Sequence, residues 1–384
     1  MPLKHTLTSI TAGLLALRGA RAGFDNTSKS NVAVYWGQNS YGQGSGNLSQ
    51  RRLSYYCANN DIDIIPLAFM TTITDNNGLP ELNFANQGDQ CSTFSGTQLF
   101  NCPQLALTAV VSSEDIPLCQ TKYNKTILLS IGGATYTEGG FSSADAANAA
   151  ARMIWSTFGP ASSSSTTNTT TFRPFGAAAV DGFDLDFEST VSNMQPFTAT
   201  LRALMDASTA SDGRRRYLTA APQCPYPDAA DNSFLSGPAG DGAGAVAIDA
   251  VFVQFYNNYC GLQSFAPNST AQWNFNFATW DAWARDVAAR KGARVFLGVP
   301  AKESAAGSGY KAAPDLAPII AYARTFSSFG GVMMWDASQA YANPGFLGAV
   351  KSKLEEAKKE GERAVSEEPE TCGGSPGRAS GFVA

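Results

Sequence analysis

The sequence predicts an α/β protein, a (β/α)8 TIM barrel that forms a single catalytic domain. Eight short apolar segments alternate with helical or long connecting segments over about 330 residues, and such alternation is typical of a parallel sheet. Eight repeats of this unit suit a closed barrel. In addition, aromatic, amide and acidic residues recur where the apolar segments end, and the reacting groups of a barrel lie at those ends.

The expected strands are rich in β-branched, aromatic and small apolar residues, and they cover residues 32–36, 62–69, 126–131, 180–188, 217–221, 250–256, 294–299 and 330–335. The expected helices lie between them, at residues 47–59, 105–118, 143–158, 194–210, 273–291 and 314–328. Ser143 is a suitable N-cap for the third helix. A doubly wound sheet is the alternative fold, but residues 37–42 lack the G-x-G-x-x-G spacing of its phosphate-binding turn.

The two ends of the chain differ in character from the expected barrel. Residues 1–22 combine a basic start, an apolar run over 7–17 and the cleavage pattern Ala20-Arg21-Ala22, which predicts a signal peptide and a mature start near Gly23. A first helix of the fold is the alternative interpretation. Residues 23–350 form the expected catalytic domain, and 351–384 a charged helical extension followed by a disordered polar tail.

Secretion restricts the available chemistry. The single histidine, His5, leaves with the signal peptide, which excludes Ser-His-Asp and Cys-His catalysis and histidine-ligated metal sites. The seven cysteines enter an oxidising compartment, where we expect them to pair. We expect a secreted glycoprotein, extracellular or associated with a cell wall, because five N-x-S/T sequons occur, at Asn26, Asn47, Asn124, Asn168 and Asn268.

Composition excludes other classes of protein. The chain has 384 residues, of which 15% are charged, and a net charge of −5. A mildly acidic protein is a poor candidate for binding nucleic acid through phosphates. After the N-terminal segment, no stretch is long and apolar enough to span a bilayer, and the C-terminus carries no lipid-anchor signal.

The centre of the chain carries a row of acids. On a strand, Asp184, Asp186 and Glu188 point to one face, while residues 183, 185 and 187 form an apolar opposite face. Three carboxyls crowded in a poorly solvated place cannot all ionise, so at least one proton is retained. A proton on the outermost acid is what general acid catalysis needs. A solvated acidic stripe and a Ca²⁺ or Mg²⁺ cluster remain alternatives.

The other strand ends indicate a carbohydrate cleft. Aromatic faces stack on sugar rings, and amides and acids bond to hydroxyl and acetamide groups. Core packing is the alternative for any single residue, above all for Trp36 and Phe69. The residues at these ends are Trp36, Gln38, Phe69, Gly132, Gly133, Gln223, Gln254, Tyr256 and Trp335.

These motifs resemble one known family. Residues 181–188, DGFDLDFE, are similar to the D-x-x-D-x-D-x-E signature of the family-18 glycoside hydrolases, and residues 130–133, SIGG, to its S-x-G-G motif. The segments YWGQN, AAPQCP, VQFYNN and GGVMMW, which begin at residues 35, 220, 253 and 330, resemble the plant and fungal class III, hevamine-like chitinases. The resemblance covers residues 32–350, in order.

The resemblance implies an endo-acting chitinase that retains configuration by substrate assistance, an exception to the usual pair of enzymic carboxyls. Glu188 would protonate the glycosidic oxygen, and the acetamide of the −1 sugar would attack its own anomeric carbon to give an oxazolinium ion. Asp186 would bond the acetamide N–H, Asp184 would hold or exchange the proton of Asp186, and Tyr256 would donate to the acetamide oxygen. No cofactor and no metal are implied.

The resemblance also implies binding residues and disulfide-bonded loops. With the strand-end residues above, the implied substrate-binding set is Tyr35, Gln38, Phe69, Gly133, Gln223, Gln254, Asn257 and Trp335. The implied disulfides are Cys57–Cys119, Cys91–Cys102 and Cys224–Cys260. Cys372, in the tail, is the odd cysteine, and a free thiol, a bond between chains and an incomplete C-terminus are the alternatives for it. Residues 161–171 and 231–244 are longer than is usual in this branch, and Asp336 stands where plant members tend to have serine.

Two other functions remain open. A catalytically silent chitin-binding lectin or inhibitor would share the barrel, although such relatives usually lose Glu188, Asp186 or Tyr256, which this chain keeps. An endo-N-acetylglucosaminidase acting on N-glycans would share the mechanism. The expected partner is chitin or a chitooligosaccharide, with no nucleic acid and no membrane span, and the expected state is a monomer.

Overall fold

The computed structural model describes residues 23–105, 114–161, 172–269 and 271–366. The expected signal peptide, the sequon at Asn168 and the polar tail with Cys372 lie outside these ranges. No helix within them is long and apolar enough to cross a membrane.

The eight expected strands are all present and close into a parallel barrel. Their order around the barrel is the order of the chain, and β1 pairs with both β2 and β11. The strands are almost entirely buried. Their apolar composition fits this position, because a parallel barrel covers both faces of every strand. The barrel strands are β1 Asn31–Val34, β2 Ile64–Thr72, β6 Thr126–Gly132, β7 Gly182–Asp186, β8 Tyr217–Ala220, β9 Ala250–Gln254, β10 Arg294–Pro300 and β11 Phe329–Trp335.

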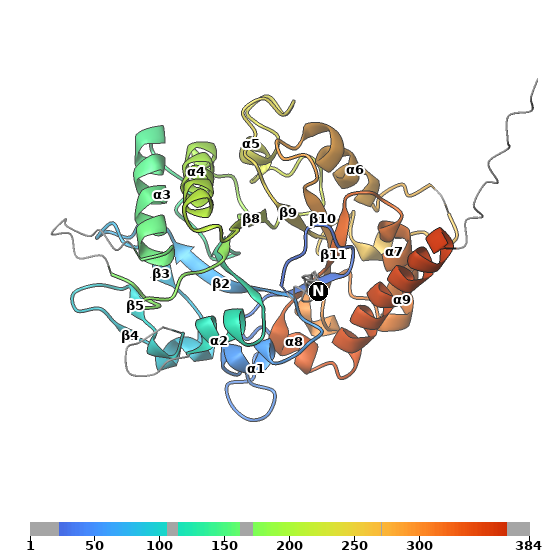
Figure 1. Ribbon diagram of the computed structural model, residues 1–384, viewed down its shortest axis with the longest axis horizontal. Coiled ribbons are helices and arrows are strands. Elements are labelled where there is room, and N and C mark those ends of the chain that lie inside the picture. The colour runs from blue at the N-terminus through green and yellow to red at the C-terminus, as the bar shows by residue number, and fades with distance from the viewer. Residues whose placement is uncertain (1–22, 106–113, 162–171, 270, 367–384) are drawn as a thin grey trace, which may run out of the picture.

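Helices surround the strands (Figure 1), with α3 and α4 on one side and α6, α7 and α9 on the other. Ser143 caps α3 as expected, since its side chain accepts from the Ala146 N–H. The helices are α1 Leu53–Cys57, α2 Asp115–Thr121, α3 Ala144–Phe158, α4 Met194–Asp212, α5 Asn232–Leu235, α6 Phe277–Ala282, α7 Ala313–Arg324, α8 Ala337–Tyr341 and α9 Phe346–Ser366.

Several connections differ from the sequence prediction. The helix expected over 47–59 is confined to α1, because residues 37–50 form an irregular loop at the barrel mouth. The helix expected over 273–291 is α6 followed by one π-helical turn, Trp283–Val287. The short helices α5 and α8 were not anticipated. Of the helix expected over 105–118, residues 106–113 lie outside the described ranges.

The long connection after β2 contains three short strands that the sequence did not predict. β3, Glu81–Leu82, extends β2 by antiparallel pairing, and β4 Ser92–Thr93 pairs with β5 Phe100–Asn101. The connection is fixed by a disulfide between Cys91 and Cys102. Cys57–Cys119 and Cys224–Cys260 are also bonded, so all three implied pairs are present.

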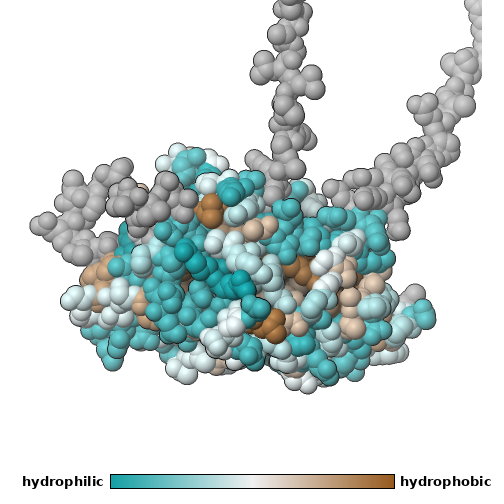
Figure 2. Space-filling model, turned by 90° about the horizontal axis from the view of Figure 1, so that it is seen from below, coloured by the Kyte–Doolittle hydropathy of each residue, from teal (hydrophilic) through white to brown (hydrophobic). Residues whose placement is uncertain are grey.

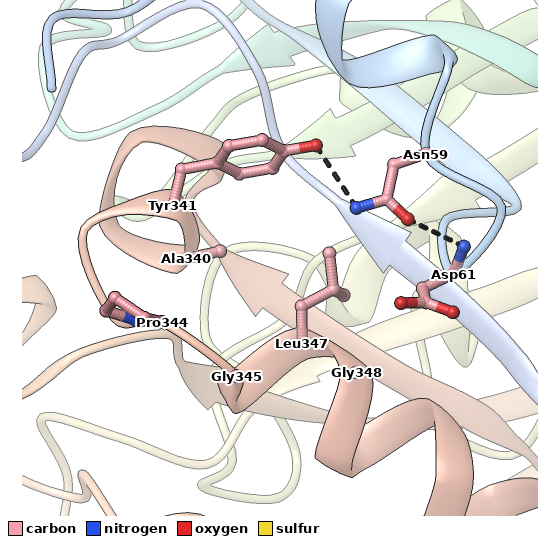
Figure 3. Close-up of a pocket in the computed structure, with 8 residues that line it drawn as sticks. All are labelled: Asn59, Asp61, Ala340, Tyr341, Pro344, Gly345, Leu347 and Gly348. Atoms are coloured by element: carbon pink, nitrogen blue, oxygen red, sulfur yellow. Dashed lines mark hydrogen bonds between the residues drawn. The ribbon is translucent and has the colours of Figure 1, made fainter. Parts of the chain in front are cut away.

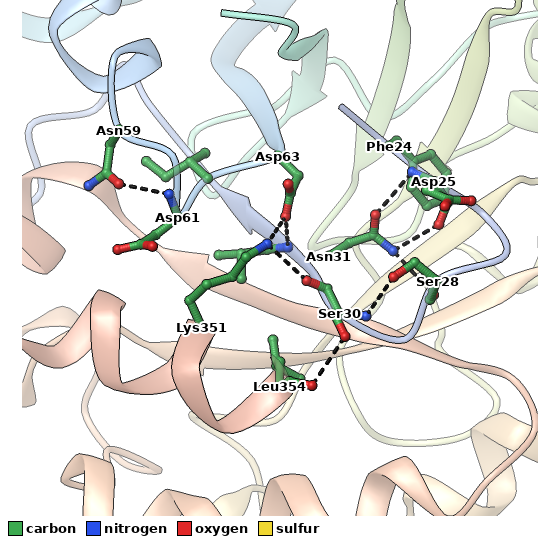
Figure 4. Close-up of polar contacts among 12 residues, drawn as sticks. Phe24, Asp25, Ser28, Ser30, Asn31, Asn59, Asp61, Asp63, Lys351 and Leu354 are labelled. Carbon is green, nitrogen blue, oxygen red and sulfur yellow. Dashed lines mark hydrogen bonds and ion pairs between the residues drawn. The ribbon is translucent and has the colours of Figure 1, made fainter. Parts of the chain in front are cut away.

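The C-terminal helix α9 belongs to the barrel. It runs without a break through residue 350, and Leu354 is fully buried. Figure 4 shows how it is attached: Lys351 Nζ pairs with Asp63 at 2.8 Å, and the Ser30 hydroxyl donates to the Leu354 carbonyl at 3.1 Å. The domain boundary expected at residue 350 therefore falls inside this helix.

The face shown in Figure 2 is mostly hydrophilic, with hydrophobic residues scattered singly among polar ones. Scattered apolar residues of this kind are normal on a protein surface.

Candidate active site

The row of acids lies at the carboxyl end of β7, on the inner face of the barrel. Asp184 is fully buried and Asp186 is 3% exposed, whereas Glu188 lies two residues beyond the end of the strand and is exposed. The alternation expected from the sequence therefore leads from a buried acid to one at the open rim.

Asp184 is held by three hydroxyl groups. Its Oδ2 accepts from the Tyr35 hydroxyl at 2.6 Å and from the Ser130 hydroxyl at 2.7 Å, and its Oδ1 accepts from the Thr219 hydroxyl at 2.6 Å. Strand register explains this arrangement, because Ser130 and Thr219 are the direct neighbours of Asp184 on β6 and β8. Burial raises the pKa of Asp184, and the three donors oppose that rise by stabilising the ionised form.

Asp186 is the acid most disposed to keep a proton. Burial raises its pKa well above the ordinary value, and the negative charges of Glu188, Asp184 and Asp228 add to the rise. Its opposing contact is a hydrogen bond from Gln254 Nε2 to Oδ1, at 2.9 Å. The sequence prediction of at least one retained proton agrees with this environment, but the strongest rise belongs to the middle acid rather than to the outermost one.

Glu188 also has a raised pKa. Although the residue is exposed, its carboxyl stands at the wall of the barrel mouth, where partial loss of solvent raises the pKa and the negative charge of Asp228 raises it further. An acid at the rim that holds its proton more firmly than usual can deliver that proton to a bound molecule.

Tyr256 follows the end of β9 and faces the same acids. Burial and the charges of Asp186, Glu188 and Asp184 raise the pKa of its phenol well above the ordinary value, so the hydroxyl keeps its proton and can donate a hydrogen bond. Gly309 packs directly against it, since a Cβ at this glycine would lie 2.9 Å from the Cβ of Tyr256. The connection after β10 therefore fixes the tyrosine.

Aromatic side chains form one wall of the mouth. The rings of Phe69 and Trp335 are stacked, with centroids 5.7 Å apart and planes at 20°, and Trp335 is half-buried. Gly133 adjoins this pair, because a Cβ there would lie 2.7 Å from the Phe69 ring. Tyr35 lies behind the wall, 1% exposed. Its hydroxyl donates to Asp184, and its contact with substrate stays a prediction.

The expected amides serve different contacts. Gln254 donates to Asp186 and to the Ala221 carbonyl. Gln223, half-buried, pairs with Gln254 across the strands and accepts from Asn258 at 2.9 Å. Gln38 Nε2 donates to the carbonyls of residues 68 and 83, and Asn257 Oδ1 accepts from the backbone of residues 307 and 308. Through these bonds the two side-chain amides fix the loops of the mouth.

Asp336, which departs from the plant pattern, has a structural role here. Its Oδ1 accepts from the Ser338 hydroxyl and the Gln339 N–H, which caps α8, and its Oδ2 accepts from the Ser40 N–H at 3.1 Å. Asp336 thereby ties the loop after β1 to the end of β11.

Sequence reasoning assigned no role to four polar residues around the acids. Ser130 was noted only as the first residue of the S-x-G-G motif, and Thr219 could have been found as a hydroxyl residue in an otherwise apolar strand. Asp228 and Asp231, both buried, lie on the connection between β8 and α5, and nothing in the local sequence indicated their position. Among the described residues, no group of three or more His, Cys, Asp and Glu side chains is arranged to hold a metal ion.

A pocket lies elsewhere on the molecule, away from the acid row. This pocket of about 330 Å³ opens between the α1–β2 connection and the α8–α9 segment (Figure 3). Asn59 donates to the Tyr341 hydroxyl at 3.1 Å and accepts from the Asp61 N–H at 2.8 Å. The eight lining residues, none of them from the acid row, are Asn59, Asp61, Ala340, Tyr341, Pro344, Gly345, Leu347 and Gly348.

Comparison with known proteins gives consistent matches over the barrel. The family model described as Glycosyl hydrolases family 18 matches residues 31–318. A class III chitinase from Arthroderma benhamiae is 47% identical over 348 residues, which cover 91% of this chain and 92% of that protein. Endochitinase 33 from Trichoderma harzianum is 42% identical over 350 residues, covering 91% of this chain and 99% of that protein.

Among solved structures, a xylanase and alpha-amylase inhibitor protein from Scadoxus multiflorus superposes with a TM-score of 0.59 and 28% identity, covering 84% of this chain and 98% of that one. A protein described as an inhibitor thus shares this barrel, so the fold by itself does not identify an activity.

Proposed function

The chain belongs to glycosyl hydrolase family 18, and from that premise we propose that it is a chitinase. It hydrolyses β-1,4 linkages between N-acetylglucosamine units inside chitin and chitooligosaccharides. The relatives described as a class III chitinase and an endochitinase, at 47% and 42% identity over nearly the whole chain, support the substrate and the internal position of the cut.

The observation that carries the proposal is the graded row of acids, with Asp184 held by three hydroxyls, Asp186 by one amide, and Glu188 at the open rim. In the proposed reaction Glu188 gives its proton to the glycosidic oxygen. The bond to the anomeric carbon breaks as the acetamide oxygen of the −1 sugar attacks that carbon. Glu188, now ionised, then takes a proton from the water that opens the oxazolinium ring.

Asp186 and Tyr256 act on the acetamide. Asp186 accepts from the acetamide N–H, and its partial negative charge offsets the positive charge that develops on the ring. Its raised pKa supports a proton shared with Asp184, which the acetamide N–H can replace when substrate binds. Tyr256, protonated in this acidic setting, donates to the acetamide oxygen and sets its angle.

The wall beside these groups supports sugar binding. The half-buried Trp335 offers an aromatic face of the kind on which sugar rings stack, and Phe69 and Gly133 back it. We propose that the −1 sugar lies against Trp335 with its acetamide between Asp186 and Tyr256. Gln223 and Gln254 would border the same sugar.

A catalytically silent lectin or inhibitor is the second candidate function. It is supported by the solved structure of a protein described as an inhibitor, which has the same fold. Such a protein would bind oligosaccharide without turnover. The presence of Glu188, Asp186 and Tyr256 around one mouth argues for the enzyme, because a binding protein gains nothing from burying acids that resist ionisation.

We also propose that the protein is secreted. The N-terminal pattern and the three disulfides, which form and persist in oxidising compartments, support this. Recovery of the mature chain from culture medium, with Gly23 near its N-terminus by mass spectrometry, is the test.

The activity is tested with Glu188→Gln, which keeps the shape of the side chain and removes its proton. We expect turnover of chitopentaose, followed by chromatography of the products, to fall at least ~10²-fold. Calorimetric binding of the same oligosaccharide should be retained. Glu303→Gln is the matched control, because Glu303 is an exposed glutamate on the connection after β10, and it should behave as wild type. Near-normal turnover in Glu188→Gln would refute the role of the acid.

A further inference from the structure

Two carboxyl groups outside the acid row face the same mouth. Asp228 and Asp231 both lie on the connection between β8 and α5, and they are 6% and 0% exposed. Their environments differ, although only two residues separate them.

Asp228 is fixed by three backbone donors. Its Oδ2 accepts from the Gln223 N–H at 3.1 Å, and its Oδ1 accepts from the N–H groups of Ala230 and Asp231, each at 2.9 Å. Burial raises the pKa of Asp228, and these donors oppose the rise. Backbone N–H groups stabilise a carboxylate over a carboxylic acid, so Asp228 is the more readily ionised of the two.

Asp231 lacks such support. Neither of its side-chain oxygens has a hydrogen-bond partner among the described residues. Burial raises its pKa well above the ordinary value, and the charges of Asp228, Asp186, Asp184 and Glu188 add to the rise. A fully buried carboxyl without donors resists ionisation, so Asp231 is the harder of the two acids to ionise.

Asp228 is linked to the acid row through the backbone. It holds the N–H of Gln223, and Gln223 pairs with Gln254 across the ends of β8 and β9. Gln254 in turn donates to Asp186. The carboxylate therefore lies on a hydrogen-bonded path to the acids, and its position is set by the strand ends rather than by a flexible loop.

No basic side chain compensates the charge of Asp228. The acids around Glu188 are Asp184 and Asp186 on β7 and Asp228 and Asp231 after β8. The phenol of Tyr256, after β9, lies among the same acids, whereas the Tyr35 phenol bonds to Asp184. Across the ranges that the structure describes, no ion pair involves any of these five carboxyls. Among the described residues, the charge that raises the pKa of Glu188 is that of Asp228.

We infer that Asp228 is a positioning residue that keeps Glu188 protonated between reaction cycles and at the same time fixes Gln223 beside the cleft. The inference rests on the proposed role of Glu188 as general acid. Asp228 touches neither substrate nor a reacting atom, and it acts through its charge and through the backbone that it holds. After Glu188 has given up its proton, the same charge favours the return of a proton to Glu188.

The test is the pH dependence of kcat/KM on chitopentaose for the wild type, Asp228→Asn and Asp231→Asn. The basic limb of this profile reports the pKa of the essential acid in the free enzyme. Removing a nearby negative charge makes Glu188 easier to ionise, so in Asp228→Asn the basic limb should move to lower pH, by on the order of one pH unit. Asp231→Asn makes the same chemical change in the same connection, but it replaces a carboxyl without donors that resists ionisation, so it should leave the limb in place.

Each outcome decides the inference. A limb that moves in Asp228→Asn alone supports it, whereas a limb that moves in neither variant, or equally in both, overturns it. If Asp228→Asn fails to fold by circular dichroism, Asp228→Ser, whose hydroxyl keeps one backbone bond, is held to the same criterion. A wild-type basic limb at or below the ordinary glutamate pKa of about 4.3 would overturn it without any variant. An inactive wild-type enzyme would instead refute the proposed function.

Discussion

The hydroxyl cage around Asp184 gives a sharp test of how the acid row is held. Thr219→Val is nearly isosteric and removes only the hydroxyl that donates to Asp184 Oδ1 at 2.6 Å. Thr219 is fully buried, so water cannot replace the lost donor. The two remaining donors, Tyr35 and Ser130, both bond to Oδ2, which leaves Oδ1 without a hydroxyl partner.

The expected size of the effect depends on the charge of Asp184. A hydrogen bond to a charged group contributes about 1.5–3 kcal/mol, and one to a neutral group about 0.5–1.5 kcal/mol. The Thr219 hydroxyl lowers the pKa of Asp184 against the rise caused by burial, so the variant has a still higher folded-state pKa. Below the folded-state pKa, Asp184 is neutral in both proteins, and the destabilisation should be about 1 kcal/mol there.

As the pH rises through the folded-state pKa of Asp184, this acid becomes a carboxylate. In the variant the carboxylate has two hydroxyl donors in place of three. The loss in free energy of unfolding should therefore grow to about 1.5–3 kcal/mol near pH 8. Urea unfolding of both proteins between pH 4 and pH 8, with matched m-values, measures the difference.

Thr198→Val is the matched control. Thr198 is equally buried, but its hydroxyl donates to the neutral Met194 carbonyl one helical turn earlier. Its loss should cost at most about 1.5 kcal/mol, with no dependence on pH. If Thr219→Val cost less than about 0.5 kcal/mol, or as much at pH 4 as at pH 8, Asp184 would not be an ionised group held by its hydroxyl donors.

Two further predictions concern the product and the loops. Substrate assistance retains configuration, so NMR of freshly formed product should show the β-anomer, and an initial α-anomer would exclude the oxazolinium route. The Cys224–Cys260 disulfide spans 36 residues, and replacing both cysteines by serine should lower the free energy of unfolding by about 3–4 kcal/mol. Because this bond joins the connections that carry Gln223 and Asn257, KM in the disulfide variant should rise more than kcat falls, and an unchanged KM would contradict this role.

The order of elements could be predicted from the sequence because it depends on short-range pattern. A parallel barrel buries both faces of apolar strands that alternate with helical segments. The resemblance to family 18 predicted the same fold. Where the chain forms irregular loops, as over residues 37–50, or a single π-helical turn after α6, the prediction was less accurate. Those conformations depend on contacts with distant loops rather than on the local sequence.

The acids themselves were visible in the sequence, since alternation on one strand places Asp184, Asp186 and Glu188 on a common face. What holds and tunes them was not. Ser130 and Thr219 come from β6 and β8, and Tyr35 directly follows β1. Asp228 lies on the connection after β8. Only closure of the barrel brings these groups within hydrogen-bonding or electrostatic range.

The sequence alone thus determined which acids are the proposed reacting groups and their order along one strand, because a strand has a fixed period of two residues. The tertiary structure decided which of the acids is caged, which has the most strongly raised pKa and which reaches the open rim. Hydrogen bonding and burial set a carboxyl's pKa, and both depend on neighbours that are distant in the chain and become adjacent only through strand register around a closed barrel.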